Sequence, residues 1–222
     1  MASDVWRERA VSMKRRVEIP LGRMAAVLTT VLLLSGCGGS ASAKGSTQTG
    51  LTVEKDGQVV FYIVDSFDKG YYDIDELRDM AQREVEAHNG GKSYGEAGSV
   101  SLESVAKMEG DEQQVRVVYR FSDSAAYSAF QKEMLYYETI EQAIQSRHIF
   151  SGTVLFNGGE TITLDEENQK KMAGRHILVT ETAAKIHLPY GVAYYSEGVQ
   201  LMEDGSVDTS ECREPAVLLL KK

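Results

Sequence analysis

Cys37 is the residue of this sequence whose surroundings point most directly to a chemical modification. It follows Leu34, Ser35 and Gly36, which close an apolar run that starts at Met24. An apolar segment, then small residues, then a cysteine is the pattern of a bacterial lipobox, in which the thiol receives a lipid and the chain before it is cleaved away. The sequence therefore predicts lipidation of Cys37 and a mature chain that begins at this residue.

Residues 1–36 have the parts of a signal peptide. Lys14-Arg15-Arg16 supplies positive charge before the apolar run, which is eleven residues long. A helix that crosses a membrane needs about 20 apolar residues, so this run is expected to be a signal core and not a permanent span. Met13 is a more ordinary signal-peptide start than Met1, and both stay open as the initiator.

The histidines are the next residues that could do chemistry, as bases or as metal ligands. None of them forms the i, i+4 pair of a helical zinc site, and no cysteine or glutamate stands beside them at metal-ligand spacing. Two of them would approach each other if 177–180 and 185–188 formed a hairpin. We expect ordinary surface or sheet histidines, and neither a metal site nor a cofactor. The four are His88, His148, His176 and His187.

Two further patterns match the letters of known sites without their context. Gly91-Lys92-Ser93-Tyr94-Gly95 has the G-x-S-x-G letters of a serine hydrolase, but that serine must stand between a strand and a following helix, and here the pattern follows a predicted helix. A calcium loop that starts at Asp65 would need oxygen ligands where Phe67 and Lys69 stand. The sequence therefore predicts no catalytic residue, and the nearby acids are expected to cap a helix and end a strand.

The mature chain is strongly acidic. The leader holds six of the 24 basic and three of the 33 acidic residues, which leaves 18 basic and 30 acidic residues and a formal net charge of −12. Such a body attracts neither nucleic acid nor anionic headgroups, so the lipid is the expected attachment to the membrane. Cys212 is the one cysteine left in the mature chain, so no internal disulfide can form. This favours a Gram-positive or anaerobic surface over an oxidising periplasm.

The elements that would position these residues follow from hydrophobic period and turn signals. Residues 37–50 are the lipidated cysteine and a flexible Gly/Ser-rich tether with a reach of about 20 Å. Residues 51–174 are expected to form an α+β domain: an antiparallel sheet of hairpins with two or three helices. Residues 175–222 are expected to be a strand-rich segment packed on the same domain. Its last strand, 216–220, is wholly apolar and should be buried on both faces.

Turn and cap residues locate the individual elements. Hairpins are predicted at Asp56-Gly57, Gly110-Asp111, Asn157-Gly158-Gly159 and Asp204-Gly205, and helix starts at Asp73, at Ser122 or Asp123, at Thr139 and near Asp165.

Several segments together resemble a family. The lipobox, the stretch from Asp65 to Leu77, the stretch 176–180 and the stretch 186–199 are similar to a group of uncharacterised surface lipoproteins of Gram-positive anaerobic bacteria. The resemblance covers most of the mature chain and implies diacylglyceryl attachment at Cys37. It implies no activity, substrate or cofactor.

These observations favour a lipid-anchored extracytoplasmic protein on the outer face of the cell membrane. Its expected role is non-catalytic: it binds or organises an envelope or extracellular ligand that the sequence does not identify. The alternative is an extracytoplasmic hydrolase whose site is assembled only in the fold, with His148, His176 or His187 meeting a serine and an acid.

Overall fold

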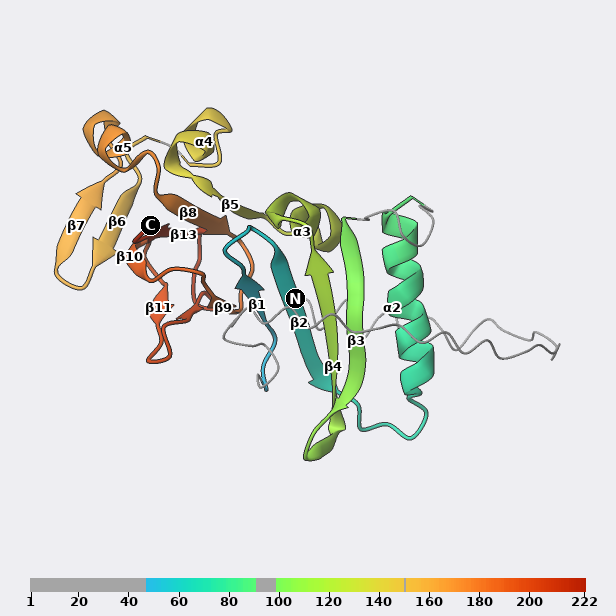
Figure 1. The fold of residues 1–222 in the computed structure, drawn as a ribbon. Coiled ribbons are helices and arrows are strands. Elements are labelled where there is room, and N and C mark those ends of the chain that lie inside the picture. The colour runs from blue at the N-terminus through green and yellow to red at the C-terminus, as the bar shows by residue number, and fades with distance from the viewer. Residues whose placement is uncertain (1–46, 91–98, 150) are drawn as a thin grey trace. The chain divides into compact units, whose positions relative to one another are not determined.

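The computed structural model describes residues 47–90, 99–149 and 151–222, and all of them belong to one compact unit, Ser40–Lys222. These residues form an α+β fold, as predicted (Figure 1). They contain two sheets and four helices, where the sequence predicted one sheet with two or three helices. The predicted signal peptide, the predicted lipobox with Cys37 and the G-x-S-x-G letters at 91–95 lie outside the described residues. Among the described helices, none is long and apolar enough to cross a membrane.

The first sheet, sheet A, has the strand order β11-β12-β9-β1-β2-β4-β3. Its hairpins form at the predicted turns, with Gly57, Gly110 and Gly205 in the left-handed region that glycine accepts. Its strands are β1 (Gly50–Val53), β2 (Val59–Ser66), β3 (Val100–Met108), β4 (Asp111–Phe121), β9 (Lys185–His187), β11 (Gln200–Leu201) and β12 (Val207–Asp208).

Sheet A is mixed, where the sequence predicted an antiparallel sheet. β1 runs antiparallel to β2 on one side and parallel to β9 on the other. Glycine at position 50 allows the close approach to β9, because a Cβ there would collide with the carbonyl oxygen of Lys185. A parallel pairing between distant segments leaves no turn signal in the sequence, so it could not be predicted from one.

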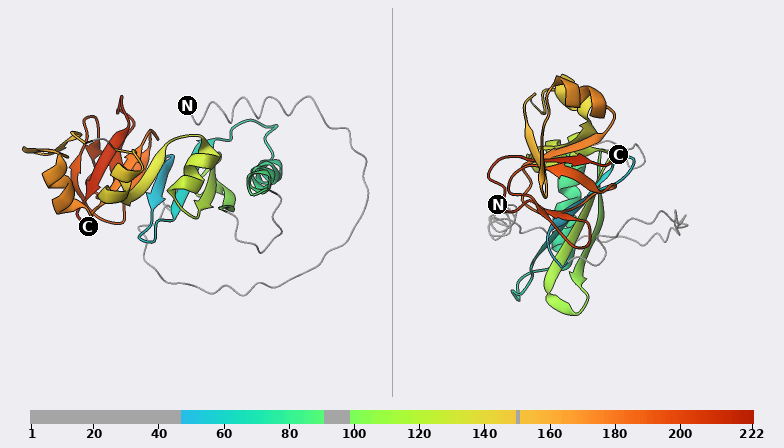
Figure 2. Two further views of the ribbon diagram at one scale, coloured as in Figure 1. Left: turned by 90° about the horizontal axis from the view of Figure 1, so that it is seen from above. Right: turned by 90° about the vertical axis from the view of Figure 1, so that its left-hand side faces the viewer.

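Two helices pack against sheet A: α2 (Ile74–His88) along its edge strand β3, and α3 (Ser124–Gln131) against β3 and β4. α2 begins at Asp73, whose carboxylate accepts from the backbone N–H groups of residues 75 and 76. α3 begins at Asp123, which accepts from the N–H of Ala126. Both caps agree with the predictions. Figure 2 looks down the axis of α2 and shows it beside the sheet. The rings between helices and sheet are Phe61, Tyr119, Phe121, Tyr127, Phe130 and His88.

The second sheet, sheet B, has the order β5-β8-β13-β10-β6-β7. Its middle strand β13 (Ala216–Leu220) is buried at every residue, as the unbroken apolar run predicted. The others are β5 (Leu135–Thr139), β6 (Val154–Asn157), β7 (Glu160–Thr163), β8 (His176–Thr180) and β10 (Val192–Tyr195). α4 (Ile140–Gln145) and α5 (Glu166–Met172) begin at Thr139 and Asp165, where caps were predicted, and α4 packs on the core of this sheet.

The chain after β8 crosses from sheet B to sheet A. Thr182 in this crossing shares a hydrogen bond with the Tyr127 hydroxyl of α3, at 3.1 Å. Its carbonyl also accepts from the hydroxyl of Thr209, at 2.7 Å. Because of this crossing, each sheet takes strands from both sides of residue 174. It also separates β8 from β9, so 177–180 and 185–188 do not form the hairpin that would have brought His176 and His187 together.

Candidate functional site

β5 is the strand around which the chemically competent residues of sheet B gather. It lies at the edge of the sheet and pairs with β8 along one side. Its other side is bound by serines one helical turn apart on α3. The Ser128 hydroxyl accepts from the N–H of Leu135 at 2.9 Å, and the Ser124 hydroxyl accepts from the N–H of Tyr137 at 3.1 Å. β5 is therefore held on both edges, and its side chains alternate between two covered faces.

The end of α4 returns the chain onto β5. The N–H of His148 donates to the carbonyl of Ala143 at 2.9 Å, and the N–H of Arg147 donates to the carbonyl of Ile144 at 3.2 Å. This pair of bonds is a Schellman motif, whose left-handed position usually holds glycine. Here it holds Arg147, with φ 60°. A side chain in this conformation is strained, and strained residues often stand beside functional ones.

The turn places His148 against two side chains of β5. Its Nδ1 lies 2.5 Å from Oε1 of Glu138, and its ring stacks on Tyr136 with centroids 3.4 Å apart and planes within 2° of parallel. The His148 side chain keeps 27% of its exposure and that of Glu138 keeps 18%. We call Tyr136, Glu138 and His148 the dyad cluster.

The dyad cluster has two of the three parts of a nucleophilic site. A carboxylate at Nδ1 fixes the imidazole ring and its tautomer, which leaves Nε2 as the nitrogen that can exchange a proton. A neighbouring ring on one face limits rotation of the imidazole further. The cluster supplies a base and an acid but contains no serine, so the arrangement foreseen for a hydrolase is met in part.

A second aromatic group lies on the other face of β5. Tyr137 stacks on His176 with centroids 5.0 Å apart, and His176 lies 5.8 Å from the ring of Tyr190. The Lys222 ammonium lies 5.7 Å from the Tyr190 ring centroid, within reach of a cation–π interaction. His176 thus lies beside two tyrosine rings. It is on the opposite face of sheet B from the dyad cluster.

The Tyr137 hydroxyl is buried and has no hydrogen-bond partner among the described residues. Burial, with the nearby Tyr190, raises the pKa of Tyr137 to about 12. The hydroxyl is therefore a neutral donor at physiological pH. An unpaired buried hydroxyl weakens the folded state, since it gave up its hydrogen bonds to water.

The remaining histidines, His88 and His187, belong to sheet A and the helices packed on it. His88, the last residue of α2, packs edge-on against Phe130 of α3, with centroids 5.2 Å apart. His187 lies on β9, opposite Thr52 of β1. Burial lowers the pKa of His187, and Asp204 opposes that effect. Among the described residues, no group of three or more His, Cys, Asp or Glu side chains could hold a metal ion.

Asp204 belongs to the β11–β12 turn and is bonded from two sides. Its carboxylate accepts from the Lys185 ammonium at 2.7 Å and from the N–H of Ser206 at 3.0 Å. These bonds, with Lys185 first, hold the pKa of Asp204 well below its usual range. The bonds of Asp204 with Lys185 and Ser206 hold the β11–β12 turn beside β9 and so stabilise the short strands at that edge of sheet A.

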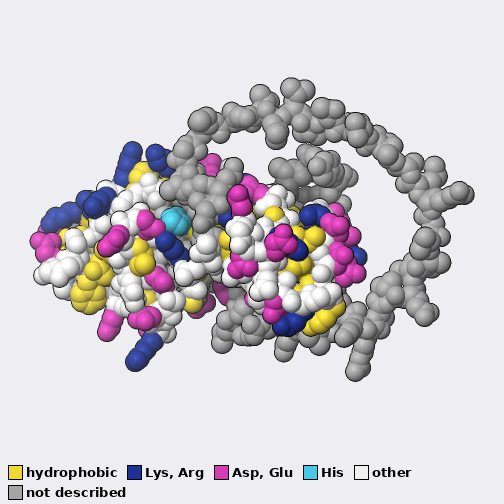
Figure 3. All heavy atoms as spheres, turned by 90° about the horizontal axis from the view of Figure 1, so that it is seen from below, with side chains coloured by type: hydrophobic (Ala, Val, Ile, Leu, Met, Phe, Trp, Pro, Cys, Tyr) yellow, Lys and Arg dark blue, Asp and Glu magenta, His cyan; other side chains and the backbone are white. Residues whose placement is uncertain are grey.

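The acids of the rejected calcium loop have structural partners. Asp68 accepts from the Lys69 ammonium at 2.7 Å, and Asp65 accepts from the N–H of Ser66 at 2.7 Å. Asp73 caps α2, as predicted. Figure 3 views this end of sheet A from below and shows Asp and Glu side chains spread over it. Beside these acids, the rings of Tyr71 and Tyr72 meet edge-on at 4.9 Å, and Tyr71 is 66% exposed.

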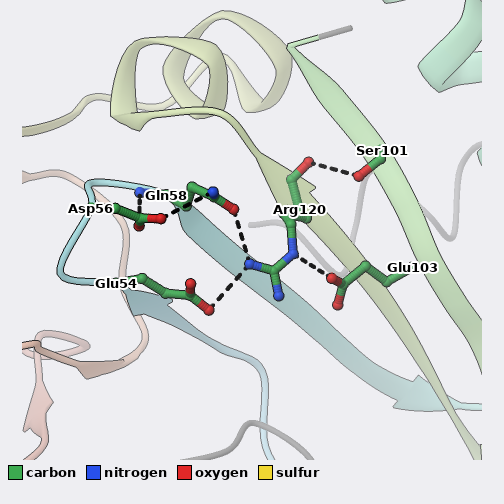
Figure 4. A network of polar contacts seen from close by, with 6 residues as sticks. All are labelled: Glu54, Asp56, Gln58, Ser101, Glu103 and Arg120. Carbon is green, nitrogen blue, oxygen red and sulfur yellow. Dashed lines mark hydrogen bonds and ion pairs between the residues drawn. The ribbon is translucent and has the colours of Figure 1, made fainter. Parts of the chain in front are cut away.

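Arg120 of β4 binds residues of β3 and of the β1–β2 turn (Figure 4). Its guanidinium donates to Glu54 at 3.1 Å and to Glu103 on β3, and it also donates to Gln58 at 3.1 Å. Burial would lower the pKa of Arg120, but the bonds from the two carboxylates outweigh it and raise that pKa. Glu54 and Glu103 are both paired with the one guanidinium, so we interpret the network as a structural clamp at the β1–β2 turn.

Cys212 is a half-buried free thiol between β12 and β13. Burial, with Asp208 nearby, raises its pKa, so the thiol is less reactive than an ordinary cysteine. A Cβ at Gly198 would come within 3.3 Å of the Cys212 Sγ.

No protein-family model, no curated protein and no solved structure matches this chain.

The dyad cluster is the grouping that sequence reasoning missed. Glu138 and His148 stand on either side of α4, and a short helix with a tight end brings its flanks together. The signal that could have found them is the Thr139 capping box, which fixes where α4 starts. The end of α4 could not be placed in the same way, because Arg147 stands where a glycine would mark it.

Proposed function

We propose that this protein is a lipid-anchored extracytoplasmic protein whose folded body binds or organises a ligand at the cell envelope without catalysing a reaction. Cys37 carries the lipid, and the body starts at β1, with residues 38–49 as the connection. The group of Gram-positive surface lipoproteins that the sequence resembles has the same organisation.

The anchoring proposal rests on Leu34-Ser35-Gly36-Cys37 after the apolar run, and the place where the chain enters the fold is compatible with it. β1 begins at Gly50 and lies in the interior of sheet A, between β9 and β2. Thr49 already binds β2, because its hydroxyl accepts from the N–H of Val64 at 3.0 Å and donates to the carbonyl of Val64 at 3.2 Å. A body fixed this close to Cys37 would stay within a short distance of the membrane surface.

Exposed apolar side chains support a binding role. Five large apolar side chains are exposed on the described surface, although the chain is rich in charged residues that could cover that surface. Exposed apolar groups that are not scattered singly often mark interaction sites. They are Tyr71, Val154, Phe156, Leu201 and Met202.

The test of anchoring is the mass of the N-terminal peptide of the native protein, together with cell fractionation. We expect a peptide that begins at diacylglyceryl-modified Cys37, and we expect Cys37→Ala to leave the chain uncleaved. Cys212→Ala is the matched control, because it removes the other cysteine and should change neither result. An unmodified Cys37 with residues 1–36 still attached would refute the proposal.

A second candidate function, an extracytoplasmic hydrolase, has one observation in its favour: the contact between His148 and Glu138. It would use His148 Nε2 as general base toward a hydroxyl or water. Hydrolysis of a panel of 4-nitrophenyl esters, compared between the native protein and His148→Ala, tests it. His176→Ala is the control, because that histidine lies on the opposite face of β5. Equal rates for all three proteins would exclude this role of His148 on these substrates.

A further inference from the structure

The two sheets end in four edge strands within the described part of the chain: β11 and β3 in sheet A, and β5 and β7 in sheet B. A free edge presents unpaired N–H and C=O groups, which can pair with another chain. Natural proteins therefore protect their edges with bulges, charged side chains, very short strands or covering elements. The four edges of this protein differ in how far they are protected.

Three of the four edges carry such protection. β3 is interrupted by register shifts at 102/104 and 107/108, and it presents Glu103 and Lys107. β5 is covered by the serine hydroxyls of α3. β11 has two residues.

β7 is a four-residue edge strand with no bulge in its pairing with β6, and its one charged residue, Glu160, stands at the turn end. Its hairpin with β6 closes on Gly158-Gly159, with Gly158 at φ 59°, so Asn157 and Glu160 form the first hydrogen-bonded pair. The alternation of an antiparallel ladder then turns the N–H and C=O groups of Thr161 and Thr163 outward. The Thr163 carbonyl accepts from Asn168 of α5 at 2.8 Å. The N–H groups of both threonines and the Thr161 carbonyl remain available on the outer edge.

Apolar side chains stand beside this edge. Val154 and Phe156 of β6 are 44% and 38% exposed, and they lie directly across the ladder from Thr163 and Thr161. These four side chains share one face of the hairpin, because paired residues of an antiparallel ladder point the same way. A strand added outside β7 would lie next to the threonines, with the two apolar side chains within reach of its longer residues.

We propose that the outer edge of β7 binds an extended segment of a partner polypeptide by strand addition, an inference that rests on the proposed binding role. The segment would alternate β-branched or aromatic residues with polar ones, so that its apolar side chains meet the face of Val154 and Phe156. Exposed acids stand at both ends of the edge. Glu160, which accepts from the Tyr194 hydroxyl at 3.1 Å, is at one end, and Asp165, which caps α5, is at the other with Glu166. The segment therefore carries lysine or arginine at both of its ends.

The same charges argue against a second copy of this chain as the occupant. Two β7 strands related by a twofold axis at Ile162 would place Glu160 of each copy opposite Leu164 of the other, next to Asp165. Like charges would then meet at both ends of the pairing, and each mature body carries a formal charge of −12.

The test is a library of random nine-residue peptides displayed on phage, selected on the full chain and counter-selected on Thr161→Pro. Proline at 161 removes an outward N–H and leaves the bonds to β6 in place. We expect enriched peptides with alternating β-branched residues and basic ends. Their affinity for Thr161→Pro should be lower than their affinity for the native chain by a factor of about ten or more. Thr161→Val, which keeps the N–H, should bind them as the native chain does.

Phe156→Thr provides a second readout that leaves the backbone edge intact, and it should weaken the same peptides several-fold. The proposal is overturned if no peptide distinguishes the native chain from Thr161→Pro while circular dichroism shows that both are folded. It is also overturned if sedimentation shows a dimer of the native chain that Thr161→Pro dissociates. These measurements use purified protein, so they fail or succeed independently of the lipid on Cys37.

Discussion

His148 and Glu138 are joined by a 2.5 Å contact between Nδ1 and Oε1, although α4 and its closing turn separate them in sequence. The contact fastens the end of α4 to β5. Glu138→Gln should lower the free energy of unfolding by about 1–2 kcal/mol, because an amide oxygen replaces the charged acceptor of this hydrogen bond. Urea denaturation measures this. Glu141→Gln, on the exposed first turn of α4, is the control, and an equal effect of both changes would contradict the importance of this contact.

Two buried tyrosines should respond oppositely to loss of their hydroxyls. Tyr127 shares a hydrogen bond with Thr182, whereas the Tyr137 hydroxyl has no partner among the described residues. Tyr127→Phe should destabilise the fold by about 1 kcal/mol, and Tyr137→Phe should be neutral or stabilising. Thermal and urea unfolding compare the two variants directly. A clear destabilisation by Tyr137→Phe would show that its hydroxyl has a partner after all.

Gly50→Ala should disrupt the parallel pairing of β1 with β9. The added Cβ would collide with the backbone carbonyl of Lys185 and come within 2.7 Å of the Tyr62 hydroxyl. Backbone cannot move aside as a flexible side chain can, so we expect a loss of about 3 kcal/mol or more. Gly70→Ala is the matched control, because nothing lies within 4 Å of a Cβ there. Similar unfolding midpoints for the two variants would contradict the pairing.

His187 should make stability depend on pH. Its folded pKa is lowered, so the unfolded chain binds the proton more readily than the folded one. This contribution is fully present above the unfolded pKa of about 6.5 and is lost as pH falls toward the folded pKa. His187→Gln should flatten that part of the stability profile, measured by urea denaturation across the range. Ser210→Ala, an exposed and non-titrating change, should leave the profile as it is, and an unchanged slope in His187→Gln would refute the assignment.

The elements that the sequence predicted well are those fixed by neighbouring residues. Asp56-Gly57 and Gly110-Asp111 form hairpins, and Asp73 and Thr139 cap helices, because turn and cap geometry depends on a few adjacent backbone groups. The sorting of strands into two sheets depends instead on contacts between distant segments. The sequence carries no local signal for these contacts.

The candidate site was less predictable than the fold. β5 was not predicted as a strand, because Leu135–Thr139 is five residues long and stands between two helices. Without β5, nothing placed Tyr136 and Glu138 on one face and Tyr137 on the other. The position of His148 depends in addition on a left-handed arginine, which sequence patterns do not anticipate.

The interior position of β1 has a mechanical consequence. A load on the body that is resisted at Cys37 would reach the fold through the N-terminal end of β1, which is bonded to β2 along one edge and to β9 along the other. Tension applied along a strand shears the bonds of both ladders together, whereas tension on a hairpin edge opens them one by one. Under the proposed anchoring at Cys37, a force on the body would therefore be resisted by both ladders of β1 at once.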